Sequence, residues 1–173
     1  MISSNQKYTV LIISTLAVLT AAIYGYTQTQ QELDLDRNLT TLNQTTISYN
    51  TSQTTGNITT YVMDNKELRA KGLMNITKME KDGMIFVYEE ADSRSFWMKN
   101  TYMPIYIYFL DKEGNTLNRN FAEAPDQPEN VRGGGQHTYS SNGNAKYVIE
   151  LRKEVVERKE ITEETVFDVS RFQ

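Results

Sequence analysis

The densest group of side chains with binding potential lies in residues 96–101, which read Phe-Trp-Met-Lys-Asn-Thr. A strand that carries an aromatic ring, a cation and an amide just before a turn can line a small pocket. Trp97 and Lys99 fall on one face of such a strand, because side chains alternate between faces. The same residues also fit a packing role, in which Lys99 lays its aliphatic stem on apolar surface and Asn100 and Thr101 form an ordinary turn.

Most other arrangements that support catalysis or metal binding are missing. The chain has no cysteine and a single histidine, His137, for which we expect a surface position; this excludes a thiol nucleophile, a disulfide scaffold and a multi-histidine metal site. Residues 111–115 have the carboxylate spacing of a calcium loop but lack its later glycine and glutamate, so we expect a hairpin turn. No nucleophile elbow, phosphate-binding loop or zinc-protease motif occurs. We therefore assign no catalytic residue, no metal ligand and no cofactor.

Charge and length limit the classes of protein to consider. The 173 residues include 22 acidic and 18 basic ones, which gives a formal net charge of −4. Binding to nucleic acid depends on clustered lysine and arginine that neutralise phosphates, so no nucleic-acid partner is expected. The length suits one ordinary domain with appendages, and the composition divides the chain into three segments.

The first segment, residues 1–26, is predicted to be a membrane anchor. Residues 9–26 contain no charged side chain, and a helix over them would be about 27 Å long, close to the thickness of a bilayer core. Lys7 precedes this stretch and acidic residues follow it, so the positive-inside rule places the N-terminus in the cytoplasm. We expect a single-pass protein of the cell membrane with an extracellular C-terminal domain. A signal peptide cleaved near residues 20–22 is the alternative.

The second segment, residues 27–57, is rich in threonine, asparagine, glutamine and serine and is predicted to be an extracellular linker. Threonine-rich stretches also form strands, and residues 47–49 are a candidate for one. Acceptor sequences for N-glycosylation occur here four times and once more in the next segment, at Asn38, Asn43, Asn50, Asn57 and Asn75. We expect N-glycans on several of them, with a polar spacer free of sugar as the alternative. Together with the missing disulfides, these sites favour an archaeal or bacterial envelope.

The third segment, residues 58–173, is predicted to be one globular domain. A short helix should begin after Asn65, a good N-cap, and end at Gly72, a good C-cap. Alternating apolar residues and turn signals predict further elements: strands at 84–88, 95–99, 104–110, 116–122, 145–151 and 165–172, and a helix at 152–159. The predicted fold is α+β and predominantly β. It is a compact, small barrel-like or strongly curved sheet with one or two short helices, preceded by a single transmembrane helix.

Several blocks of this domain together resemble the family named domain of unknown function 192. The blocks are Arg-Ala-Lys-Gly-Leu-Met at 69–74, Gly-Met-Ile-Phe at 83–86, the 96–101 block, Pro-Ile at 104–105 and Tyr-Val-Ile-Glu-Leu at 147–151. The 96–101 block is the specific one. The resemblance covers roughly residues 58–170 and implies a compact, mostly β domain with a helix, often exported or membrane-tethered in bacteria and archaea. It implies no activity. The residues that match the family pattern and form our candidate ligand site are Arg69, Trp97, Lys99, Asn100 and Thr101.

The chain also departs from the family pattern. Members commonly carry an aspartate where Tyr106 stands here. The alanine-glycine that usually follows the 147–151 strand is replaced by arginine and lysine at 152–153, and the glycine-aspartate before the last strand by two glutamates at 163–164. If the aspartate serves a ligand or a reaction in relatives, this chain has lost that function while keeping the fold.

These features predict a membrane-anchored extracellular binding or accessory domain, a subunit of a cell-surface or membrane complex without catalytic activity of its own. The alternative is a small envelope enzyme, a hydrolase or a carbohydrate-acting enzyme, with a pocket around Arg69, Trp97, Lys99 and Asn100. Such an enzyme requires a concave site in which a lysine or a carboxylate has a shifted pKa. An accessory domain requires a stable protein partner in the membrane or envelope. A purely structural envelope component is a third, weaker reading.

Overall fold

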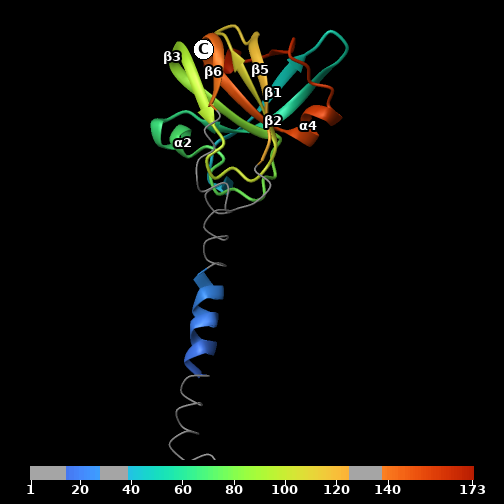
Figure 1. Ribbon diagram of the computed structural model, residues 1–173. Helices are drawn as coiled ribbons and strands as arrows, with labels where there is room; N and C mark the ends of the chain where they lie inside the picture. Colours follow the sequence, from blue (N-terminus) through green and yellow to red (C-terminus); the bar gives the residue numbers. More distant parts are fainter. Residues whose placement is uncertain (1–14, 28–38, 125–137) are drawn as a thin grey trace, which may run out of the picture. The chain divides into compact units, whose positions relative to one another are not determined.

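The computed structural model describes residues 15–27, 39–124 and 138–173 (Figure 1). The chain divides into two units, residues 1–41 and 42–173, and each is described by itself. In the first unit, residues 15–27 form an exposed helix. Among the described residues, no helix is long and apolar enough to cross a membrane. The first part of the predicted span, residues 9–14, lies outside the described residues, as do Asn38 and His137.

The second unit is mostly β, with a nearly closed, barrel-like sheet and few short helices. Its described residues form one seven-stranded sheet in the order β5-β4-β6-β3-β2-β1-β7. A bridge between Asn115 and Val166 brings the two ends of this order together. The strands are β1 (Gln44–Asn50), β2 (Thr55–Met63), β3 (Gly83–Trp97), β4 (Ile105–Leu110), β5 (Thr116–Ala122), β6 (Thr138–Arg152) and β7 (Val166–Phe167). The short helices are α2 (Lys66–Lys71), α4 (Lys153–Arg158) and a 3₁₀ turn at Ser170–Phe172.

The sheet has two faces, and the main core lies on the first. We call first face the side that carries the buried cluster formed by Ile47, Tyr49, Ile58, Val62, Ile85, Tyr108, Leu110, Tyr147, Ile149 and Leu151, with Val156, Ile161, Phe167 and Val169 packed on it. Because side chains alternate along a strand, the neighbours of these residues on β3, β4 and β6 point to the second face. That face carries Met84, Phe86, Ile107, Phe109, Val148 and Glu150.

The long strand β3 bends so that its far end covers part of the second face. Its pairing with β6 shifts register between Val87 and Asp92, the mark of a bulge. Beyond that point the Phe96 ring meets Phe86 edge-on at 4.9 Å and Phe109 at 5.9 Å between centroids. Residues ten positions apart in one strand therefore pack together. The segments predicted as separate strands, 84–88 and 95–99, are largely the two ends of β3.

The local predictions made from capping and turn residues are confirmed. Helix α2 has Asn65 as its N-cap, whose side-chain oxygen accepts a hydrogen bond from the Leu68 N–H (2.9 Å), and it ends at Gly72 with φ of 45°. Strand β5 has the predicted limits, and α4 lies within the predicted helix. The predicted strand at 165–172 differs, because only β7 pairs and a 3₁₀ turn follows it.

The predicted linker also differs, because residues 44–57 form β1, a turn and the start of β2. Alternate residues of β1 are buried, and its pairing with β2 runs without a break from Gln44 to Asn50. β-branched threonine suits such a half-buried strand. The compact unit therefore begins near Leu42 instead of residue 58.

Candidate functional site

Arg69, the first of the predicted site residues, ties α2 to the sheet. Its Nη1 donates to the carbonyl oxygens of Asp64 (2.8 Å) and Val87 (2.9 Å). Its guanidinium carbon lies 4.8 Å from the centre of the Tyr88 ring, and that of Arg94 lies 3.8 Å from the same ring. Arg94 Nε in turn donates to a backbone carbonyl of β6 at 3.2 Å. We call Arg69, Tyr88 and Arg94 the arginine stack.

Trp97 and Lys99 lie together at the end of β3. The Lys99 Nζ is 5.1 Å from the centre of the Trp97 ring, which is a cation–π distance. Trp97 is 51% exposed, and Tyr102 in the loop that follows is 39% exposed. Thr101 between them is buried and donates its hydroxyl to the Lys99 carbonyl oxygen (3.4 Å). We call Trp97, Lys99 and Tyr102 the Trp97 surface.

Asn100 shapes the loop that carries this surface. Its φ is 51°, in the left-handed region that asparagine enters more readily than most residues. Its carbonyl oxygen accepts a hydrogen bond from the Asn75 N–H (2.8 Å), and the Tyr102 hydroxyl donates to Asn75 Oδ1 (3.4 Å). The loop after β3 is therefore fastened to the segment that follows α2.

The structure thus divides the predicted site in two. Trp97, Lys99 and Thr101 share one loop end with Asn100, whereas Arg69 belongs to the arginine stack on Tyr88. Both of the Arg69 hydrogen bonds go to backbone carbonyls, which is a structural use of the guanidinium. The family-pattern residues do not all point at one cavity, and their role in ligand binding stays a prediction.

Glu150 is a further candidate for a functional side chain, although its sequence pattern predicted only a place in a strand. It is 5% exposed on β6, and its Oε2 has no hydrogen-bond partner among the described residues. Three further polar atoms of the described chain are likewise buried and unpaired: Asn120 Nδ2 and Arg152 Nε, and Thr60 Oγ1 on β2. We call Glu150, Asn120 and Arg152 the buried polar cluster. One sequence feature indicates this residue: Glu150 stands inside the apolar run Tyr-Val-Ile-Glu-Leu. A strand that is buried on both faces seldom carries a charged side chain.

Burial sets the electrostatics of this region. It raises the pKa of the Glu150 carboxyl to about 8, because the charged form loses its hydration. Burial is also the main cause of a raised pKa at Tyr88, opposed by the charges of Arg94 and Arg69 and reinforced by that of Glu150. Tyr88 is therefore close enough to Arg69, Arg94 and Glu150 for the charge of each to act on its pKa. At neutral pH Glu150 is mainly an uncharged acid that can donate a hydrogen bond.

Tyr106, at the position where relatives carry aspartate, lies on the other side of the sheet. It pairs with Leu151 in the β4–β6 ladder and its ring is packed against the first-face cluster. The ring lies 4.9 Å from that of Phe121, and the Arg119 guanidinium carbon lies 4.8 Å from its centre. The replacement of that aspartate therefore leaves the buried polar cluster untouched.

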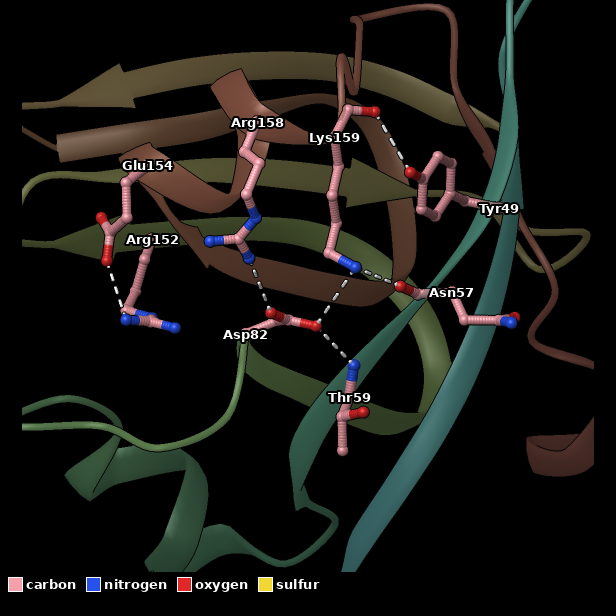
Figure 2. A network of polar contacts seen from close by, with 8 residues as sticks. All are labelled: Tyr49, Asn57, Thr59, Asp82, Arg152, Glu154, Arg158 and Lys159. Atoms are coloured by element: carbon pink, nitrogen blue, oxygen red, sulfur yellow. Dashed lines mark hydrogen bonds and ion pairs between the residues drawn. The ribbon is translucent and has the colours of Figure 1, made fainter.

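Asp82 is the centre of a separate polar network, shown in Figure 2. Its Oδ2 accepts a hydrogen bond from the Thr59 N–H (2.9 Å), so the carboxylate continues the β2–β3 pairing past the start of β3. Arg158 Nη2 and Lys159 Nζ lie 3.8 and 3.9 Å from its oxygens. Lys159 Nζ also donates to the Asn57 carbonyl oxygen (2.8 Å). Both carboxylate oxygens of Asp82 thus have partners. The network fits a structural role in which it holds the end of α4 to β2 and to the start of β3.

The described glycosylation sites are all open to solvent. Asn43, Asn50, Asn57 and Asn75 are exposed, and Figure 2 shows the Asn57 side chain directed away from the Asp82 network. Glycosylation at these asparagines remains a prediction.

Within the described residues, no group of histidine, aspartate or glutamate side chains could hold a metal ion.

Comparisons with known proteins agree on the family and the fold. The family model named domain of unknown function 192, described as an uncharacterised ACR, matches residues 48–169. A candidate transcription regulator from Sinorhizobium meliloti 1021 is similar in structure, with a TM-score of 0.63 and 23% identity over 73% of this chain and 94% of that one. A protein of unknown function from Novosphingobium aromaticivorans DSM 12444 has a TM-score of 0.62 and 22% identity over 73% and 86% of the two chains. At such identities the likeness concerns the fold alone. Among curated proteins there is no match.

Proposed function

This chain belongs to the domain of unknown function 192 family, and from that premise we propose that it is a membrane-anchored extracellular binding domain without catalytic activity of its own. Its role would be that of an accessory subunit in a cell-surface or membrane complex. The family supplies the domain but no activity, so the proposal depends on the surface and on the N-terminal segment.

The observation that carries the proposal is the Trp97 surface. A large aromatic ring that is 51% exposed, with a lysine ammonium over it and a second exposed aromatic five residues along the chain, is typical of a contact surface. Tryptophan, tyrosine and a cation bind partners well because they offer apolar area together with a polar contact. The loop is held by its hydrogen bond to Asn75, so binding a partner would cost little conformational entropy.

The N-terminal segment supports the membrane part of the proposal. In residues 15–27 the large apolar side chains are well exposed, namely Leu16, Val18, Leu19 and Ile23. A helix in water normally shows a polar face, and this one has only scattered threonine. A lipid environment would cover these side chains, and the apolar sequence begins at Thr9. Glycans on Asn43, Asn50, Asn57 and Asn75 would then lie outside the membrane.

The enzyme alternative lacks a comparable observation. It requires Arg69 and Lys99 to act on one substrate, whereas Arg69 is bonded to two carbonyl oxygens and Lys99 lies over Trp97. We therefore prefer the binding domain.

Site-specific photo-crosslinking in native membranes tests the proposal. A photoreactive phenylalanine analogue at position 102 should give one defined adduct, and Trp97→Ala should abolish it. The same analogue at position 112, an exposed turn at the other end of β4, serves as the matched control and should give none. Equal adducts from both positions, or none from position 102, would contradict the assignment of the Trp97 surface.

A further inference from the structure

The buried polar cluster has unused hydrogen-bonding capacity. Glu150 Oε2, Asn120 Nδ2 and Arg152 Nε are buried, and no described residue pairs with them. Folded proteins leave few such atoms without a partner, because each has given up its hydrogen bonds to water. A bound ligand would supply the partners that the described residues do not.

The strand register puts the three residues on one face of three adjacent strands. Glu150 stands opposite Ile107 in the β4–β6 ladder, and Asn120 stands opposite the same Ile107 in the β4–β5 ladder. Residues opposite one another in a ladder share a face, so the two side chains flank Ile107 on the second face, about 10 Å apart at their Cα atoms. Arg152 is two residues beyond Glu150 and shares its face. The cluster thus spans three adjacent strands.

The chemistry of the cluster favours a negatively charged oxygen ligand. Asn120 Nδ2 and Arg152 Nε are donors, and burial, with the raised pKa of about 8, keeps Glu150 mainly as an O–H donor at neutral pH. Arg152 adds a positive charge, and its Nη1 is already bonded to Glu154 (2.8 Å), which leaves Nε for another acceptor. Its side chain is 23% exposed, so the cluster has an edge at the surface.

We propose that Glu150, Asn120 and Arg152 form a binding site for a small carboxylate, whose oxygens accept hydrogen bonds from all three side chains. A carboxylate offers two oxygens with several lone pairs, which suits donors on neighbouring strands. The site is on the second face and does not use the Trp97 surface, so it stands or falls independently of the function proposed above.

Nuclear magnetic resonance on the full chain in detergent micelles, with sodium acetate as the probe, tests this site. Acetate should shift the Asn120 side-chain amide and Arg152 Nε–H signals in a saturable way, and sodium chloride at equal ionic strength should not. Asn120→Leu should weaken acetate binding at least about tenfold, as the loss of a charge-assisted hydrogen bond predicts. Glu150→Gln keeps a donor and should stay within a few-fold of the parent.

The matched control is Asn144→Leu, an exposed asparagine on the same strand as Glu150, which should bind acetate like the parent. The proposal fails if acetate moves neither signal, if chloride moves them equally, or if Asn120→Leu binds as tightly as Asn144→Leu. A cluster that holds only water would give the first of these results.

Discussion

The two faces of the same sheet differ in how fully their buried polar groups are paired. On the first face, the hydroxyls of Tyr49, Tyr108 and Tyr147 all donate to carbonyl oxygens, at 3.1, 3.1 and 3.3 Å. On the second face, Glu150 Oε2, Asn120 Nδ2 and Arg152 Nε are unpaired within the described chain. The first face has one such atom, the neutral hydroxyl Thr60 Oγ1, since Thr60 shares its face with Ile58 and Val62. Paired polar groups specify a core, whereas unpaired ones weaken it unless they serve another purpose.

The strongest test of this contrast uses neighbours in sequence that face opposite sides. Ile149 is fully buried in the first-face core, so Ile149→Ala should lower the free energy of unfolding by about 4 kcal/mol. Glu150→Leu replaces an unpaired carboxyl by an apolar side chain and should leave stability unchanged or raise it. Urea unfolding of both variants measures the difference. A loss at Glu150→Leu as large as at Ile149→Ala would mean that the carboxyl is a structural element.

The buried Glu150 carboxyl of the second face should make the free energy of unfolding depend on pH. The pKa of Glu150 rises from 4.5 to about 8 on folding, so the native state holds its proton more tightly than the unfolded state. Stability from this group is complete below pH 4.5, falls as pH rises through the window from 4.5 to 8, and is lost above it. Glu150→Gln should therefore be more stable than the parent by about 3 kcal/mol at pH 7, and the gap should close near pH 4.

Thermal unfolding at pH 4, 6 and 8 measures this gap. Glu163→Gln, which changes an exposed carboxylate elsewhere in the domain, is the control and should track the parent at every pH. Parallel curves for Glu150→Gln and the parent would show that the carboxyl is not held protonated.

A smaller effect on the free energy of unfolding is expected for the tyrosine hydroxyls of the first face. Tyr108→Phe removes the hydroxyl that donates to the Ile161 carbonyl and should cost about 1 kcal/mol. Asn120→Leu on the second face removes an unpaired amide and should cost less. Chemical unfolding of the two variants in parallel compares the faces directly. The contrast between them fails if the asparagine variant loses more stability than the tyrosine variant.

The smallest effect on stability should come from the Trp97 surface. Trp97→Ala should change the free energy of unfolding by no more than about 0.5 kcal/mol, since half of the ring is already in water. The same change should abolish the photo-crosslink at position 102. A stability loss as large as that of a core residue would assign Trp97 to packing, which is the alternative that its sequence pattern allowed.

The sequence predicted best the features that depend on near neighbours in the chain. Asn65 and Gly72 delimit α2 by capping, and the turn at 111–115 with β5 follows from turn residues and alternation. The prediction of a linker was wrong for residues 44–50, because a polar, threonine-rich strand acquires its buried side chains only when β2 and β7 pair with it. Arg69 was wrongly grouped with Trp97 for a similar reason, since its guanidinium bonds to the distant Val87 carbonyl oxygen, whereas Trp97 contacts its near neighbour Lys99.

The sequence by itself determined a mostly β domain of the domain of unknown function 192 family, its capped helix, and the alternation that exposes Trp97 beside Lys99. Only the tertiary structure decided that β3 bends back on itself and that Glu150, Asn120 and Arg152 share the second face of the sheet. Caps, turns and alternation act over a few residues, so they can be read along the chain. Strand register and burial depend on partners tens of residues away, and an unpaired buried carboxyl exists only once those partners have closed around it.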